Sequence, residues 1–326
     1  MSDRKVVLYF SWSRPGETGA PLGVIENRFP TLFESRRMRY PKMQELSDPA
    51  LFDQGIAGFL DHIQKPNFVA FAAQASRQSG RPVLTAERVA DDGSCTRLDG
   101  KLLKDADTLI VVSFDSLRTE QKPASEEVDA VRRFLEHPDH LVFVCPHHDI
   151  GHVDEPPSET AQEQQLAEFH HHGDHSIPPQ QGFGGFARSL LASLGIPVEN
   201  RYGLRPLLEA DGTPAPIEVE TELDTLRLLS GVPTLNQHAH LPHFERLGDA
   251  VHKVEVLARQ RIDPAAPPHP FTRGGRKTFD ALLQSRRDVF PGRVLMSDAT
   301  LFSSTAGGVE SLQRLWANIV QRPRLS

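Results

Sequence analysis

The sequence has few cysteines and no long apolar run. Only 2 of its 326 residues are cysteines, so a disulfide framework is excluded and the reducing cytoplasm is the simplest location to expect. No stretch approaches the roughly 20 apolar residues that a membrane helix needs. The apolar run at residues 5–12 is too short for a signal peptide. We therefore expect a soluble, cytoplasmic protein with no membrane partner.

An excess of positive charge is also missing. Lysine and arginine together number 36 against 43 aspartates and glutamates, which gives a net charge of -7. Nucleic acids and anionic membranes are bound through accumulated lysine and arginine, so this balance argues against a general nucleic-acid binder. We expect a small-molecule substrate, and the composition leaves open a homo-oligomer.

Short apolar runs predict the strands of a parallel sheet. Residues 107–114 and 141–145 form nearly continuous apolar runs, as strands covered on both faces require. Residues 5–12 and 293–296 have a similar character, and residues 81–89 indicate a further strand. The sequence therefore predicts a mostly parallel sheet.

Helical patterns separate these predicted strands. Residues 123–136, 181–194 and 309–321 each have apolar side chains along one helical face, and much of 31–78 has a helical pattern. Alternating strands and helices are typical of an α/β fold with helices on both faces of the sheet. We expect the whole chain to form one α/β domain.

Two regions depart from this pattern. Residues 146–180 lose periodicity and are rich in Pro, Glu, Gln and His, which predicts a long histidine-rich loop insertion. Residues from about 200 to 290 hold only short strand-like pieces, around 217–219 and 232–235, and we expect a less regular elaboration there. Most of the 15 histidines lie between residues 137 and 252, so composition directs the search for a site to this part of the chain.

The segment Cys145-Pro146-His147-His148 lies directly beyond a predicted buried strand. Ligands of open α/β sheets bind at the carboxyl ends of the strands. Cys145 could be a nucleophile with His147 or His148 as its base, or these histidines could bind a metal. Alternatively, Cys145 is a small buried side chain and the histidines belong to a solvated loop. Pro146 argues against a nucleophile elbow because it removes a backbone N–H.

Two further histidine clusters suggest a metal centre. Residues 170–175 contain four imidazoles and one carboxylate, and in residues 238–243 alternate histidines of an extended chain would share one face. Neutral imidazole and carboxylate are ligands of zinc and ferrous iron. Solvated histidine-rich loops are the competing interpretation. The candidate metal ligands are His172, Asp174, His175, His238, His240 and His243.

Two further segments are candidates for the site. Asp298 follows the predicted strand 293–296, where its carboxylate could line the same crevice, although capping of the last helix would explain it equally well. The basic, glycine-containing segment 273–277 precedes a predicted helix and could bind an anion. A flexible basic loop is the alternative for that segment.

The run from Asp107 to Gly151 resembles the core of the class I glutamine amidotransferase-like superfamily in its broad sense, which includes the ThuA-like proteins. The elements that carry the resemblance are DTLIVVSFDS, ASEEVDAVRRFLEH, LVFVCPHHDIG and the later GRVLMSDATLFSS. The resemblance implies a flavodoxin-like fold. It places Cys145 near the amidotransferase cysteine, without the glycines of that elbow, and His147 near the histidine of the ThuA-like branch.

We therefore expect an enzyme, in the first instance a metal-dependent hydrolase acting on a small polar substrate. Its catalytic candidates are Cys145, His147, His148 and Asp298, and its cofactor would be zinc or iron. A thiol enzyme of the amidotransferase-like kind that depends on Cys145 is the second hypothesis. A non-catalytic binding or scaffold protein of the same fold is the third.

Overall fold

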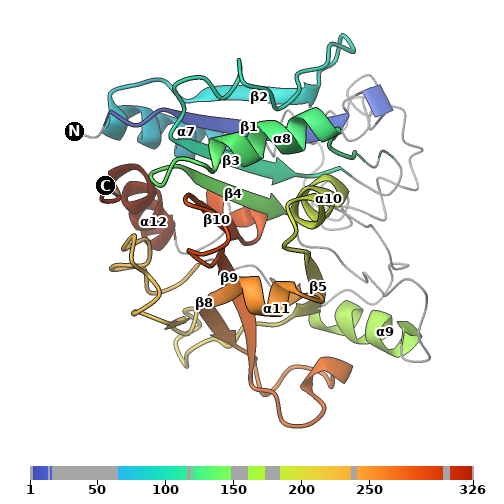
Figure 1. Ribbon diagram of the computed structural model, residues 1–326. Helices are drawn as coiled ribbons and strands as arrows, with labels where there is room; N and C mark the ends of the chain where they lie inside the picture. The colour runs from blue at the N-terminus through green and yellow to red at the C-terminus, as the bar shows by residue number, and fades with distance from the viewer. Residues whose placement is uncertain are drawn as a thin grey trace, which may run out of the picture.

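The computed structural model contains one large mixed sheet and a separate two-stranded sheet (Figure 1). It describes residues 3–13, 15–16, 65–115, 119, 121–147, 161–172, 184–235, 241–303 and 309–324. The strands are β1 Val6–Ser13, β2 Leu84–Val89, β3 Thr108–Ser113, β4 Leu141–Pro146, β5 Val198–Leu204, β6 Glu218–Val219, β7 Leu241–Arg246, β8 Val254–Arg261, β9 Thr278–Ser285 and β10 Arg293–Met296.

The large sheet has the order β2-β1-β3-β4-β10-β9-β8-β6. The first five of these strands are parallel to one another, and β9, β8 and β6 continue the sheet in antiparallel pairing. The prediction of an α/β protein with a mostly parallel sheet is confirmed. The order of the parallel strands is compatible with the 2-1-3-4-5 order of flavodoxin-like folds.

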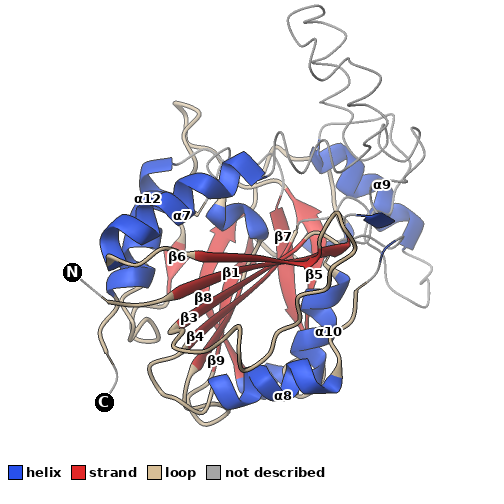
Figure 2. Cartoon of the chain, turned by 90° about the horizontal axis from the view of Figure 1, so that it is seen from above, coloured by secondary structure: helices blue, strands red, loops and turns tan. Residues whose placement is uncertain are grey.

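Helices cover both faces of this sheet (Figure 2). Helices α7 and α12 pack on one face, and α8 and α10 pack on the other. No helix in the described ranges has both the length and the apolar character needed to cross a membrane. The α-helices are α7 Lys65–Ser79, α8 Ser125–Phe134, α9 Ala161–His172, α10 Gly185–Ser193, α11 Ala250–Lys253 and α12 Val309–Gln321, and the 3-10 helices are η3 Pro270–Thr272 and η4 Ala299–Phe302.

Strand β4 shows why the apolar runs are continuous. Successive side chains of a strand point to opposite faces. Phe143 and Cys145 enter the core beneath α7 and α12, whereas Val142 and Val144 enter the core beneath α8 and α10. Because each face is covered by helices, neither set of positions can be polar, and the period-two alternation of a half-exposed strand is absent.

The structure corrects the expectation of a loop throughout residues 146–180. Residues 161–172 form helix α9, which lies against β5 and η3. Its buried positions include Gln164, Ala167 and His171. Two of these three side chains are polar, so the helix has no apolar periodicity that the sequence could reveal.

The less regular elaboration from about 200 to 290 contains more sheet than the sequence indicated. Strands β8 and β9 lie within it and extend the main sheet, whereas residues 232–235 are not a strand. The helix expected after the basic segment 273–277 is also wrong, because β9 begins at Thr278. Side chains of β8 and β9 enter both cores, so this region packs as part of the same α/β body.

Candidate functional site

The carboxyl ends of the parallel strands bring polar residues to one edge of the sheet. In Figure 1 the arrowheads of β3 and β4 point toward α10, which lies at this edge. Ser113 of β3 pairs with Pro146 of β4, and Met296 of β10 pairs with Val144. Asp115, His147 and Asp298 therefore follow three neighbouring strands at similar heights. An open α/β sheet binds its ligands at this edge.

His147 is the first residue beyond β4, and the surrounding backbone fixes its position. Its N–H donates to the Ser113 carbonyl oxygen at 3.0 Å, and its carbonyl oxygen accepts from Asn200 Nδ2 at 2.8 Å. The imidazole lies against the Phe114 ring with a centroid distance of 4.5 Å and is 9% exposed. His147 is thus a nearly buried imidazole held rigidly at the carboxyl end of a central strand.

Asp115 is a residue of this edge that the sequence analysis did not single out. Its carboxylate is fully buried and accepts hydrogen bonds from Ser113 Oγ at 2.6 Å, Phe186 N at 2.9 Å and Gln121 N at 3.1 Å. Burial raises the pKa of the Asp115 carboxyl to about 6, against the opposing effect of these donors. An aspartate soon after an apolar strand was the available signal in the sequence.

Asp115 and Ser113 hold the start of helix α10. Phe186 and Ala187 are in the first turn of that helix, where backbone N–H groups have no partner within the helix. Phe186 N donates to Asp115, and Ala187 N donates to Ser113 Oγ at 3.1 Å. Gly184 precedes the helix with a φ of +85°, and a Cβ there would lie 2.5 Å from the Cβ of Pro146. Asp115 therefore positions α10 beside the site, and this role accounts for its buried charge.

Asp298 caps a short helix directly after β10. Its Oδ1 accepts from Thr300 N at 2.8 Å, and Asp298 is the N-cap residue of η4. The capping alternative is thus correct in kind, but the capped element is η4 and not the last helix. The carboxylate also acts electrostatically on the Cys145 thiol.

Cys145 lies inside the core. Its side chain has 0% exposure, and burial, with a smaller contribution from the Asp298 carboxylate, raises the pKa of the Cys145 thiol well above its ordinary value. Only the thiolate is a competent nucleophile, and burial in apolar surroundings disfavours it. These properties match the alternative in which Cys145 is a small buried side chain.

We expect Cys145 to be alkylated at least about tenfold more slowly than Cys95 at neutral pH, because reactivity follows thiolate content and access. Cys95 is exposed and serves as a control in the same chain. Iodoacetamide labelling of the native protein, followed over time by peptide mass spectrometry, measures both rates. Equal or faster labelling of Cys145 would revive the thiol-enzyme hypothesis.

Most of the predicted metal ligands lie outside the described residues. Asp174, His175, His238 and His240 are among them, and only the backbone of His172 is described. The catalytic candidate His148 also lies outside the described residues. Within the described ranges, no group of three or more His, Cys, Asp or Glu side chains is placed to hold a metal ion. The described residues alone therefore do not supply a metal site.

His243, the remaining predicted ligand, lies in β7. Its Nδ1 accepts from Asp280 N at 3.1 Å. Burial and, to a smaller extent, the nearby Arg276 and Arg246 guanidinium groups lower its pKa to about 3. His243 is therefore a neutral, buried imidazole at physiological pH, with one ring nitrogen occupied by the backbone.

The structure joins His243 to an aromatic cluster in which His171 and His269 also take part. The ring centroids of His171 and His269 are 5.3 Å apart, those of Tyr202 and His269 are 5.8 Å apart, and those of His243 and Phe271 are 4.7 Å apart. His269 has no histidine neighbour in the chain, so its sequence context does not mark it as a site residue. These imidazoles are buried among rings and are not side chains of solvated loops.

His171 has both ring nitrogens bound to the backbone. Arg205 N donates to Nδ1 at 2.9 Å, so the proton of the neutral ring is on Nε2, which donates to the Pro267 carbonyl oxygen at 2.7 Å. Burial lowers the His171 pKa to about 4. This histidine ties α9 to two other segments and has no lone pair left for a metal.

A pocket of about 600 Å³ opens beside His171 and contains part of the basic segment 273–277. Its cationic side chains are Arg261, Arg276 and Lys277. Arg261 pairs with Glu209 at 3.2 Å, and Arg276 lies over the Phe271 ring at 4.7 Å from the centroid. Two of the three cations thus already have partners within the protein.

Comparison of the chain with protein-family models and with curated protein sequences finds no match.

Proposed function

We propose that the protein is a hydrolase-type enzyme with a flavodoxin-like, glutamine amidotransferase-like fold, and that it acts on a small polar substrate at the carboxyl ends of β3, β4 and β10. The observation that carries the proposal is the position of His147. Its imidazole follows the central strand β4, is fixed through Ser113 and Asn200, and occupies the edge at which open α/β sheets bind ligands.

His147 is the acid–base residue in this proposal. A histidine has an ordinary pKa close to neutral pH, so it can take a proton from an attacking water and return it to a leaving group. Asp298 contributes a buried carboxylate directly after the adjacent strand β10. Asp115 is a positioning residue, because one of its oxygens accepts from Phe186 N at the start of α10 and the other accepts from Ser113 Oγ.

Replacing His147 by glutamine is expected to lower kcat/KM about a hundredfold, because acid–base catalysis by one side chain contributes about 10²–10⁴ in rate. A panel of small polar esters and amides first identifies a substrate that the purified protein hydrolyses. His252→Gln, at an exposed position in α11, is the matched control and should retain the wild-type rate. Wild-type kcat/KM in His147→Gln would remove His147 from the mechanism.

We further propose that a zinc or iron ion belongs to the site, held by predicted ligands that include His175 and His240. Protein prepared without a histidine tag is expected to contain about one such ion per chain, because zinc and ferrous iron bind neutral imidazole and carboxylate. His175→Ala and His240→Ala should each lower the content measured by elemental analysis, and His252→Ala should not. Metal-free protein that takes up neither ion would show that the enzyme is not metal-dependent.

A further inference from the structure

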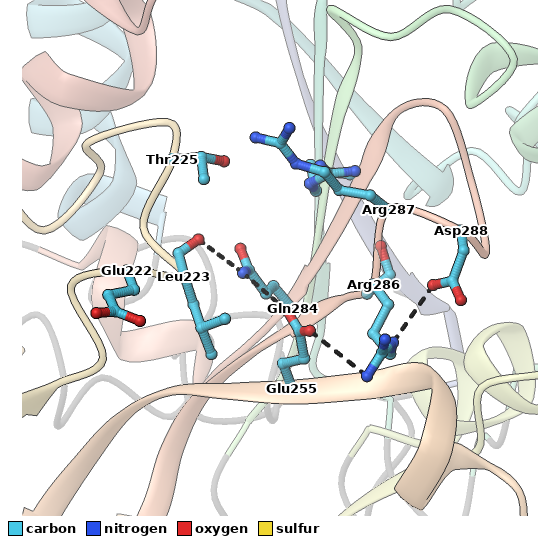
Figure 3. Close-up of a pocket in the computed structure, with 10 residues that line it drawn as sticks. Glu222, Leu223, Thr225, Glu255, Gln284, Arg286, Arg287 and Asp288 are labelled. Carbon is cyan, nitrogen blue, oxygen red and sulfur yellow. Dashed lines mark hydrogen bonds and ion pairs between the residues drawn. The ribbon is translucent and has the colours of Figure 1, made fainter.

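A second pocket lies at the amino end of the parallel strand β10, beside the turn from β9 to β10. Its volume is about 400 Å³, and its lining comes from β8, β9, that turn and the segment around Leu223 (Figure 3). The parallel strand β10 begins here with Arg293, whereas the carboxyl edge lies at the other end of that strand. This pocket is therefore separate from the site proposed above.

Arg293 is the unusual residue of this pocket. It is 3% exposed and lines the cavity, and its guanidinium donates to the Gly292 carbonyl oxygen at 3.2 Å. It forms no ion pair with any residue in the described part of the chain. Burial and, to a smaller extent, the neighbouring Arg287 lower the Arg293 pKa, and the Glu255 carboxylate partly opposes them. A buried cation that no carboxylate contacts is costly and is uncommon in proteins unless a ligand pairs with it.

The nearest carboxylates are engaged by another arginine. Arg286 lies 3.8 Å from Glu255 and 3.3 Å from Asp288, as the dashed lines in Figure 3 indicate. Gln284 Nε2 donates to Glu255 at 3.4 Å and to the Leu223 carbonyl oxygen at 2.9 Å, which holds Glu255 on the Arg286 side. Arg286 thus contacts two carboxylates, whereas Arg293 contacts none in the described part of the chain.

Arg287 adds a second cation to the same opening. Its side chain is exposed, and in Figure 3 its guanidinium faces the hydroxyl of Thr225 across the pocket. The remaining carboxylate of the lining, Glu222, is exposed and lies away from Arg287 in that view. Two guanidinium groups and a hydroxyl form a donor set suited to a doubly charged oxyanion.

We propose that this pocket binds the phosphate group of a small molecule between Arg287 and Arg293, with Thr225 as a further donor. A phosphate dianion balances the two guanidinium charges and supplies the direct ion pair that Arg293 lacks in the described part of the chain. The volume of about 400 Å³ accommodates a phosphorylated small molecule as well as the inorganic ion.

Inorganic phosphate is the probe for this proposal. Isothermal titration of the full chain should show saturable binding, and Arg287→Ala should weaken it about tenfold, a loss of about 1.4 kcal/mol. Arg261→Ala removes an exposed arginine of the larger pocket near His171 and is the matched control, with wild-type affinity expected. No binding by the wild type, or a loss of affinity in Arg261→Ala instead of Arg287→Ala, would overturn the proposal.

Arg293→Met gives an independent readout. In phosphate-free buffer we expect its Tm to equal or exceed that of the wild type, because the substitution removes an uncompensated buried charge and keeps most of the volume. Adding phosphate should raise the Tm of the wild type and leave that of Arg293→Met unchanged. A lower Tm in Arg293→Met without phosphate would mean that the arginine serves the fold, and it would count against a ligand site.

Discussion

Replacing Arg4 by methionine is expected to lower the free energy of unfolding by about 3–5 kcal/mol, the cost of removing one partner of a buried ion pair. Arg4 is 1% exposed, and its two terminal nitrogens donate to the two carboxylate oxygens of Asp139 at 2.8 and 2.9 Å. The substitution would leave the Asp139 carboxylate buried without its bidentate partner, with Arg324 at 3.5 Å. Urea denaturation followed by fluorescence measures the change.

The position of this pair explains why its effect is large. Arg4 precedes β1 and Asp139 precedes β4, at the edge where both ends of the chain lie in Figure 1. Arg322, which follows α12, donates to the carbonyl oxygens of Asp107 and Asp139, both at 2.9 Å. Burial lowers the Arg322 pKa to about 9. Several charged groups are therefore desolvated at this end of the sheet, and they stabilise the protein only while all of their partners are present.

Two controls separate this network from ordinary surface pairing. Arg261→Met breaks an ion pair with Glu209 in which both side chains are more than 40% exposed, and it should change stability by less than about 1 kcal/mol. The double variant Arg4→Met/Asp139→Leu should be more stable than Arg4→Met, because it removes the buried carboxylate together with its bidentate partner. A loss below about 1 kcal/mol in Arg4→Met would show that the pair contributes no more than a surface contact.

The secondary structure could be predicted wherever burial on both faces leaves a local signal. The apolar runs at 107–114 and 141–145 correspond to β3 and β4, and the helical faces in 123–136 and 309–321 correspond to α8 and α12. Covered strands must be apolar at consecutive positions, and helices that cover them must be apolar along one side. Both requirements produce a pattern that can be recognised within a short stretch of the sequence.

The environments of the clustered histidines could not be predicted from the local sequence. Residues 170–175 predicted ligands or a solvated loop, but His171 is a buried helix residue whose partners come from Arg205 and Pro267. His269 packs against His171 although 97 residues separate them along the chain. An imidazole is polar enough for a loop and small enough for a core, so its environment depends on distant segments that the sequence alone does not place.

The buried state of Asp115 also depends on a segment that is distant in the sequence. Its burial depends on the packing of α10 against it, and the Phe186 N–H of that helix lies 71 residues further along the chain. The pKa of the Asp115 carboxyl is raised from 3.8 to about 6 in the folded protein, chiefly by desolvation. The folded state therefore holds this proton more tightly than the unfolded state does. The stability associated with it is fully present below pH 3.8 and is lost as the pH rises through about 6.

A shift of this size corresponds to a loss of about 3 kcal/mol in stability between the protonated and ionised forms. Asp115→Asn keeps the shape of the protonated carboxyl and does not titrate. The unfolding free energy of the wild type minus that of Asp115→Asn is therefore expected to fall by about 3 kcal/mol from pH 3.5 to pH 7. Urea denaturation at a series of pH values measures this difference, and Asp249→Asn, at an exposed position, controls for the change in net charge.

The direction of that pH dependence distinguishes two accounts of the buried carboxylate. If the donors Ser113, Gln121 and Phe186 outweighed desolvation, the folded pKa would lie below 3.8, and the wild type would gain stability relative to Asp115→Asn as the pH rises. If the stability of the wild type relative to Asp115→Asn falls as the pH rises, the protein retains a costly charge at neutral pH that anchors α10 beside His147. Such a cost is characteristic of functional sites, since stability alone would favour a neutral residue there.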